Sequence, residues 1–142
     1  MSPFRLPLDG PERELLRGLL AELRGLIEAR DPEAARLFPS AAPDDAETAA
    51  EFERVARSSL TAGRLSALDV VERTLGARTL EHAELEAWTV VLNDLRLVHG
   101  DRLGITEETE LERLARHDPH HAVYAWLTWL QATMVDALAS RL

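Results

Sequence analysis

Apolar residues recur along the chain at spacings of three and four positions, the period of a helix with one buried face. The first such segment, residues 11–30, begins with Asp9 and Glu12 in the spacing of a capping box. It ends at Asp31-Pro32, because the residue before a proline avoids the α conformation. Its apolar stripe consists of Leu15, Leu16, Leu19, Leu20, Leu23, Leu26 and Ile27.

The same period predicts four further helices, at residues 46–75, 81–99, 106–117 and 119–141. A proline-rich connector at 31–45, with Leu37 and Phe38 as apolar anchors, separates the first two helices. The segment at 106–117 is rich in glutamate, and we expect it to be the most mobile part of the chain. Since β-branched runs between turn residues are absent, we expect an all-α fold: a single-domain helical bundle of about five helices spanning residues 1–142.

The pattern also predicts which residues face the core and where helices end. The apolar face of the second helix includes Phe52 and Val55, and its spacing allows a break near residues 58–63. Gly100 is expected to end the third helix, because glycine readily takes the left-handed conformation that follows many helix C-termini.

Composition excludes several classes of protein. A chain of 142 residues fits one domain, and the absence of cysteine excludes disulfides, thiolate zinc sites and thiol redox sensing. No apolar run reaches the roughly 18 residues that a membrane span needs. The N-terminus lacks the apolar core of a signal peptide, so we expect a cytoplasmic protein without membrane contact.

The charge argues against direct DNA binding. The 25 acidic residues outnumber the 16 basic ones, all arginine, which gives a net charge of −9. No block of the sequence is basic, and residues 31–60 hold three arginines against seven acids. Nucleic-acid-binding proteins usually present clustered basic side chains to the phosphates, so no direct contact with nucleic acid is expected.

The third helix is apolar almost all round and is therefore expected at the centre of the bundle. Asp94 falls among its apolar residues, where a carboxylate is costly unless it is paired. An arginine partner is expected, with Arg36, Arg54 and Arg57 as candidates. Asn93 and Arg96 complete a polar group with Asp94. This group is either a structural network that sets helix register or part of a binding site.

The last helix carries no charged residue between Asp118 and Asp136. Trp126 falls on its main apolar face, whereas Trp129 projects the other way, among alanines and threonine. A tryptophan off the core face is a candidate anchor for another protein. The alternative is that the connector or the first helix covers it.

Gly18, Ala21 and Gly25 form a stripe of small residues opposite the leucines of the first helix. The stripe would permit self-association, or it is simply an exposed face. His117 and His121 have the spacing of a metal-binding helix face, but Pro119 between them at a helix start removes that geometry, so no metal is expected.

Enzymatic chemistry is not expected. A carboxylate without a positioned histidine or nucleophile supports no acid–base scheme. Phosphate-binding, dinucleotide-binding and nucleophile-elbow signatures are absent from the sequence, so no cofactor is expected either.

Five strings together resemble a known family by their order and spacing. They are Arg36-Leu37-Phe38-Pro39, Asp44-Asp45 with Glu51-Phe52, Leu92-Asn93-Asp94-Leu95-Arg96-Leu97, Arg102-Leu103-Gly104-Ile105, and Trp126-Leu127-Thr128-Trp129-Leu130-Gln131. From about residue 5 onward the chain is similar to the actinobacterial AosR-like oxidative-stress transcriptional regulators. Most members of that family are described only as a domain of unknown function.

The resemblance implies a regulator that reaches promoters through a sigma factor or RNA polymerase. Family regulators are thought to sense oxidation through cysteines, and this chain has none, so thiol sensing cannot carry over. We therefore expect a protein-interaction module that acts on transcription through a protein partner, with Asn93, Asp94, Arg96, Trp126 and Trp129 as candidate residues. The alternative is a structural or adaptor homodimer without enzymatic activity.

Overall fold

The helices follow one another in the order that the sequence predicts. The structure, a computed structural model, describes residues 2–38 and 46–142, with the backbone alone at 46–49. The elements are β1 (Phe4–Arg5), α1 (Gly10–Glu28), the 3-10 helix η1 (Pro32–Leu37), α2 (Ala46–Thr74), β2 (Thr79–Leu80), α3 (His82–Leu103), α4 (Leu111–Ala115) and α5 (Pro119–Ala139). The prediction of an all-α domain is confirmed.

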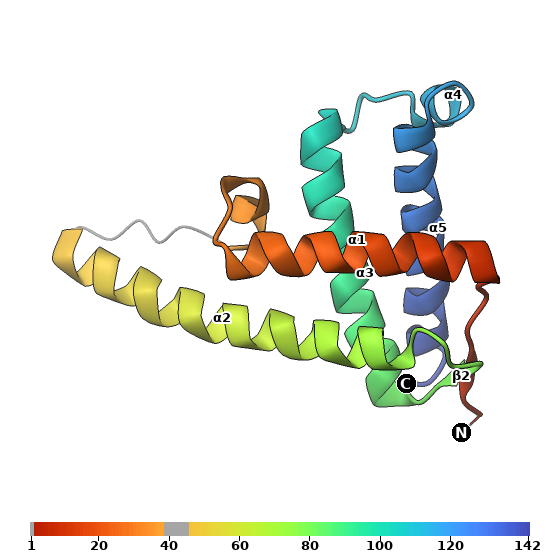
Figure 1. Cartoon of the computed structure of the whole chain (residues 1–142), viewed down its shortest axis with the longest axis horizontal. Helices are drawn as coiled ribbons and strands as arrows, with labels where there is room; N and C mark the ends of the chain where they lie inside the picture. The colour runs from red at the N-terminus through yellow and green to blue at the C-terminus, as the bar shows by residue number, and fades with distance from the viewer. Residues whose placement is uncertain (1, 39–45) are drawn as a thin grey trace.

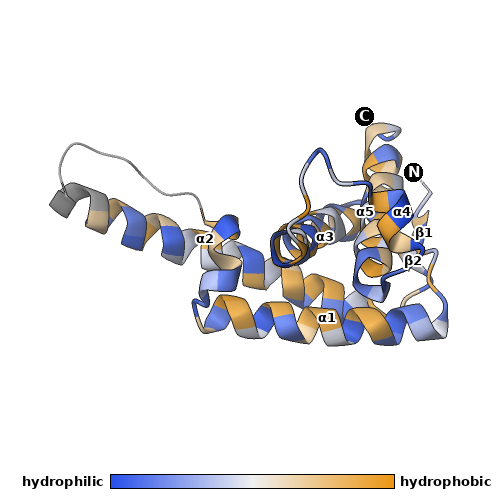
Figure 2. Cartoon of the chain, turned by 90° about the horizontal axis from the view of Figure 1, so that it is seen from above, coloured by the Kyte–Doolittle hydropathy of each residue, from blue (hydrophilic) through white to orange (hydrophobic). Residues whose placement is uncertain are grey.

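Figure 1 shows α3 and α5 side by side and antiparallel, with α1 and α2 crossing them. The view from above in Figure 2 places α1 and α2 along one side of this pair. α3 contacts α1, α2, η1 and α5, as the prediction of a central helix requires. In the core between α3 and α2, the indole Nε1 of Trp88 donates a 2.8 Å hydrogen bond to the hydroxyl of Thr74.

The capping box at the start of α1 and the two apolar anchors of the connector are confirmed. The carboxylate of Asp9 accepts the backbone N–H of Glu12 at 2.8 Å, and the Glu12 carboxylate accepts the N–H of Asp9 at 2.9 Å. Leu37 and Phe38, the expected anchors of the connector, are buried. Residues 39–45 of the connector lie outside the described residues.

Two expectations for α2 are wrong. The helix continues without a break through residues 58–63. Phe52 and Val55 do not face the core but are 60% and 63% exposed. The reason is that the N-terminal half of α2 extends beyond α1 and α3, so no described element covers this part of its apolar stripe (Figure 1). Leu68, Val71 and Leu75, nearer the C-terminus, are buried as expected.

The end of α3 also differs from the prediction. Gly100 lies inside the helix, where the absence of a side chain lets the ring of Tyr124 approach: a Cβ on Gly100 would lie 3.1 Å from its Cε2. Gly104 is the residue that ends the helix, in the left-handed conformation with φ 65°. The two glycines therefore have different roles: Gly100 leaves room for Tyr124, and Gly104 ends the helix.

A short antiparallel pairing of β1 with β2 was not predicted, because two residues are too few to give a strand pattern. Phe4 pairs with Leu80 and Arg5 with Thr79. The backbone N–H of Leu6 continues the contact with a 2.9 Å bond to the carbonyl of Arg78. The pairing ties the N-terminal segment to the loop between α2 and α3.

Candidate functional site

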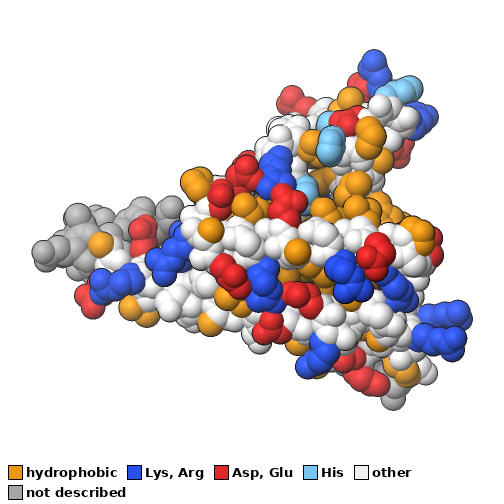
Figure 3. All heavy atoms as spheres, in the orientation of Figure 1, with side chains coloured by type: hydrophobic (Ala, Val, Ile, Leu, Met, Phe, Trp, Pro, Cys, Tyr) orange, Lys and Arg blue, Asp and Glu red, His pale blue; other side chains and the backbone are white. Residues whose placement is uncertain are grey.

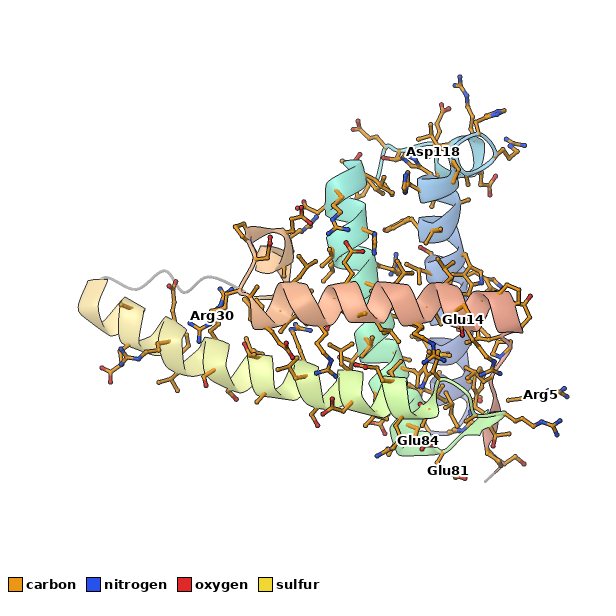
Figure 4. The ribbon with its side chains drawn as sticks, viewed as in Figure 1. Arg5, Glu14, Arg30, Glu81, Glu84 and Asp118 are labelled. Carbon is orange, nitrogen blue, oxygen red and sulfur yellow. The ribbon has the colours of Figure 1, made fainter. Side chains whose placement is uncertain are left out.

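One side of α5 has no packing partner among the described residues. Asp118 accepts the backbone N–H of His120 at 3.1 Å and begins the helix, and Figure 4 shows Asp118 at the junction with α4. Leu127, Leu130 and Met134 point into the core. The opposite side, which we call the α5 face, consists of Ala125, Trp129, Ala132 and Val135.

Trp129 is the largest side chain of the α5 face and is 51% exposed, so neither α1 nor the described part of the connector covers it. Val135, six residues further along α5, is 46% exposed. Because no charged residue occurs between Asp118 and Asp136, this exposed surface is uncharged as well as apolar. Exposed apolar surface of this kind is typical of protein-binding sites.

Trp126 lies at the edge of the α5 face next to α1. It packs partly on the core and lines a shallow hollow of about 250 Å³ with Glu12, Leu15, Ala122 and Val123. Leu15, expected in the core, is instead 40% exposed at this hollow. Apolar atoms are visible between α1 and the upper part of α5 in Figure 3. The indole nitrogen of Trp126 is buried and has no hydrogen-bond partner among the described residues.

Arg96 fixes α5 against α3 on the other edge of the face. Its guanidinium donates to the Thr128 hydroxyl at 3.0 Å and to the Gln131 side-chain oxygen at 2.5 Å. The amide of Gln131 donates to the Asn93 side-chain oxygen at 3.4 Å. Val90, one turn from Asn93 on α3, is 45% exposed. Arg96, Gln131 and Asn93 therefore form an ordered polar border beside the exposed apolar side chains.

Asp94 belongs to a different region of the molecule. Asp94 is 1% exposed, and its side chain forms an ion pair with Arg64 of α2, which also donates a 2.8 Å hydrogen bond to the carbonyl of Leu37. Burial raises the pKa of Asp94, and the positive charge of Arg64 opposes that rise. The second carboxylate oxygen of Asp94 has no hydrogen-bond partner among the described residues.

The predicted grouping of Asn93, Asp94 and Arg96 is therefore wrong as one site. Residues two positions apart on a helix point about 200° apart, since each residue turns the helix by about 100°. Arg96 faces α5 while Asp94 faces α2 and η1.

The partner of Asp94 was also predicted wrongly. Arg36 pairs with Asp101 at 3.5 Å, Arg54 with Glu51 at 3.9 Å, and Arg57 lies 4.4 Å above the ring of Phe38. Arg64 could have been found from its spacing, because it falls four residues from both Leu60 and Leu68 on the inward stripe of α2.

The small-residue stripe on α1 is an exposed surface. Gly18, Ala21 and Gly25 are all exposed, and a Cβ at either glycine would meet nothing within 4 Å. Packing within the chain thus gives no reason for these glycines, and their role in self-association stays a prediction.

One of the histidines near the start of α5 has a structural contact. His121 pairs with Asp118, the residue that caps the helix. No group of three metal-ligating side chains occurs in the part of the chain whose side chains are described. Among the described helices, none is both long and apolar enough to cross a membrane.

A family model described as "Domain of unknown function (DUF2017)" matches residues 1–138. The chain belongs to this family. The match covers every described helix of the DUF2017 domain except the last residue of α5. Searches of curated proteins and of solved structures give no match to the chain.

Proposed function

We propose that this DUF2017 protein is an interaction module that binds a protein partner through the α5 face. The observation that carries the proposal is Trp129, half-exposed on the side of α5 away from the core, in a stretch between Asp118 and Asp136 that has no charged residue. Tryptophan is enriched among the residues that contribute most to protein–protein binding, because it buries a large apolar area with few rotatable bonds.

The two edges of the α5 face give it the anatomy of a binding surface. On one side Arg96, Gln131 and Asn93 form an ordered polar border. On the other side Trp126 and Leu15 line the hollow against α1. An apolar centre with a polar rim is the usual arrangement of a protein–protein interface.

The partner that we propose is a sigma factor or RNA polymerase, so that the protein regulates transcription. This part rests on the resemblance to the actinobacterial AosR-like regulators. A net charge of −9 also favours action through a protein over direct contact with DNA. Without cysteine, any signal must reach the protein by a route other than thiol oxidation.

Affinity capture from a native lysate of the source cells tests this function. The wild-type chain is expected to recover a sigma factor or RNA polymerase, and Trp129→Ala is expected to lose it. Val55→Ala, which removes an exposed apolar side chain from α2, is the matched control and should retain the partner. If the wild type recovers only itself, the regulatory function is wrong.

A structural or adaptor homodimer remains the second candidate, because the Gly18, Ala21 and Gly25 stripe is open and close helix approach is sterically allowed there. The solution mass of wild type and of Gly18→Arg distinguishes the two. A dimeric wild type that becomes monomeric in the variant favours the homodimer. An unchanged mass rules out this stripe as the dimer contact.

A further inference from the structure

Seven of the chain's 16 arginines pair with an acid among the described residues. Arg24 contacts the carboxylates of Asp69 and Glu72 at 2.6 Å, and Arg102 pairs with Glu22 and Glu33. Arg5, Arg13 and Arg78 are among the arginines without an acidic partner in the described part of the chain, although acids outnumber bases overall. The three arginines line one hollow of about 490 Å³, together with Leu6, Leu8 and Thr79.

The fold holds these arginines together. The β1–β2 pairing places Arg5 opposite Thr79, next to Arg78. Arg13 reaches from α1 to the carbonyl oxygens of Leu75 and Ala77, the latter at 3.0 Å, which fixes its guanidinium beside the end of α2. Figure 4 shows Arg5 extending outward from this end of the molecule. No acidic side chain lines the hollow among the described residues.

We propose that this arginine hollow binds a compact small-molecule anion that carries two or more negative charges, either a polycarboxylate or a phosphate ester. Three neighbouring positive charges repel one another, and a bound anion would relieve that repulsion. Guanidinium groups bind carboxylates and phosphates through paired hydrogen bonds. The volume lies within the roughly 300–1,000 Å³ of small-molecule sites, and Leu6 and Leu8 offer an apolar wall to the ligand's carbon skeleton.

The surroundings favour a compact ligand over a nucleic acid. Asp9 and Glu12 cap the start of α1 and precede Arg13 in the chain. Each accepts a backbone N–H of the other, and neither pairs with the three arginines. Glu81 and Glu84 flank the other side at the start of α3, as Figure 4 shows. An extended polyanion would run past these acids, whereas a small anion contacts the arginines alone.

Calorimetric titration with citrate and, separately, with inorganic pyrophosphate tests the proposal on the full chain. The wild type is expected to bind at least one of them at a single saturable site, and the anion bound identifies the carboxylate or the phosphate class. The double variant Arg5→Gln/Arg78→Gln is expected to weaken binding by at least about tenfold. Both residues are exposed, so the variant should fold, as its melting temperature will verify.

The matched control is Arg17→Gln/Arg113→Gln, which removes the same charge from exposed positions on α1 and α4. The affinity of this control for the anion should stay within about twofold of the wild type, because salt screens charges that lie far from the hollow. Absence of saturable binding of both anions to the wild type would overturn the proposal. Equal weakening in both double variants would also overturn it, because the binding would then follow net charge and not this site.

Discussion

Replacing Arg64 by methionine removes the only described partner of the buried Asp94 carboxylate while keeping a long apolar side chain on α2. Asp94 is 1% exposed, and its second oxygen is already without a described partner. The variant must therefore either bury an uncompensated charge or protonate Asp94. Removing one member of a buried ion pair costs about 3–5 kcal/mol of the free energy of unfolding.

That loss corresponds to a large change in melting temperature. Unfolding entropy is about 2.1 cal/mol/K per residue near 60 °C, or roughly 0.3 kcal/mol/K for this chain of 142 residues. The melting temperature of Arg64→Met should therefore fall by about 10–17 °C at pH 7. Arg57→Met is the matched control, because Arg57 lies over the ring of Phe38 and has no acidic partner in the described chain. It should cost about 1 kcal/mol or less.

The effect of pH gives this prediction its sharpest test. Burial raises the pKa of Asp94 above that of the unfolded chain, and the loss of Arg64 raises it further. A carboxyl with a raised pKa binds its proton more tightly in the folded state. Stability is then fully present at low pH and is lost as the pH rises from about 3.9 to the raised pKa, by up to about 1.4 kcal/mol per pH unit.

Urea unfolding of wild type, Arg64→Met and Arg57→Met across this range measures the effect. The free-energy difference between Arg64→Met and wild type should narrow as the pH falls toward about 4. An equal difference at all pH values, or a loss below about 1 kcal/mol at pH 7, would refute the assignment of a buried, ionised pair.

Three further variants test individual contacts and backbone positions in α1, α2 and α3. Thr74→Val leaves the indole N–H of Trp88 without its acceptor and should lower the free energy of unfolding by about 1–3 kcal/mol in urea titration; an unchanged value would mean that the bond is not formed. Gly104→Ala puts a side chain at φ 65° and should cost about 1–2 kcal/mol, seen as a lower melting temperature. Gly18→Ala, where a Cβ meets nothing within 4 Å, should stabilise the monomer by up to about 1 kcal/mol in thermal unfolding. A loss of stability there would indicate that a second copy packs on the stripe.

The sequence was most informative where one residue determines local structure. The capping box at Asp9 and the start of α5 at Asp118 follow from backbone N–H groups that need an acceptor close by in the chain. The position of Trp129 off the apolar face of α5 also followed from helical spacing, although the sequence left open whether another segment covers it. Each of these helix starts, and the direction of Trp129, depends on one helix alone.

Relations between helices were not predictable in the same way. Helical periodicity shows that Asp94 is buried but not which neighbour it meets, so Arg64 was missed in favour of three other arginines. The same limit applies to Phe52 and Val55, whose apolar spacing is correct although no described element covers that end of α2. The hollow formed by Arg5, Arg13 and Arg78 depends on the β1–β2 pairing, which has no sequence pattern.

The dissociation constant of the complex with the captured sigma factor or polymerase subunit, measured with purified proteins, tests the role of the α5 face most directly. Trp129→Ala should raise the dissociation constant by about 30-fold or more, the equivalent of about 2 kcal/mol for a central tryptophan. Val55→Ala should leave it within about twofold of the wild type. Equal dissociation constants for Trp129→Ala and the wild type would contradict the assignment of the α5 face as the docking surface.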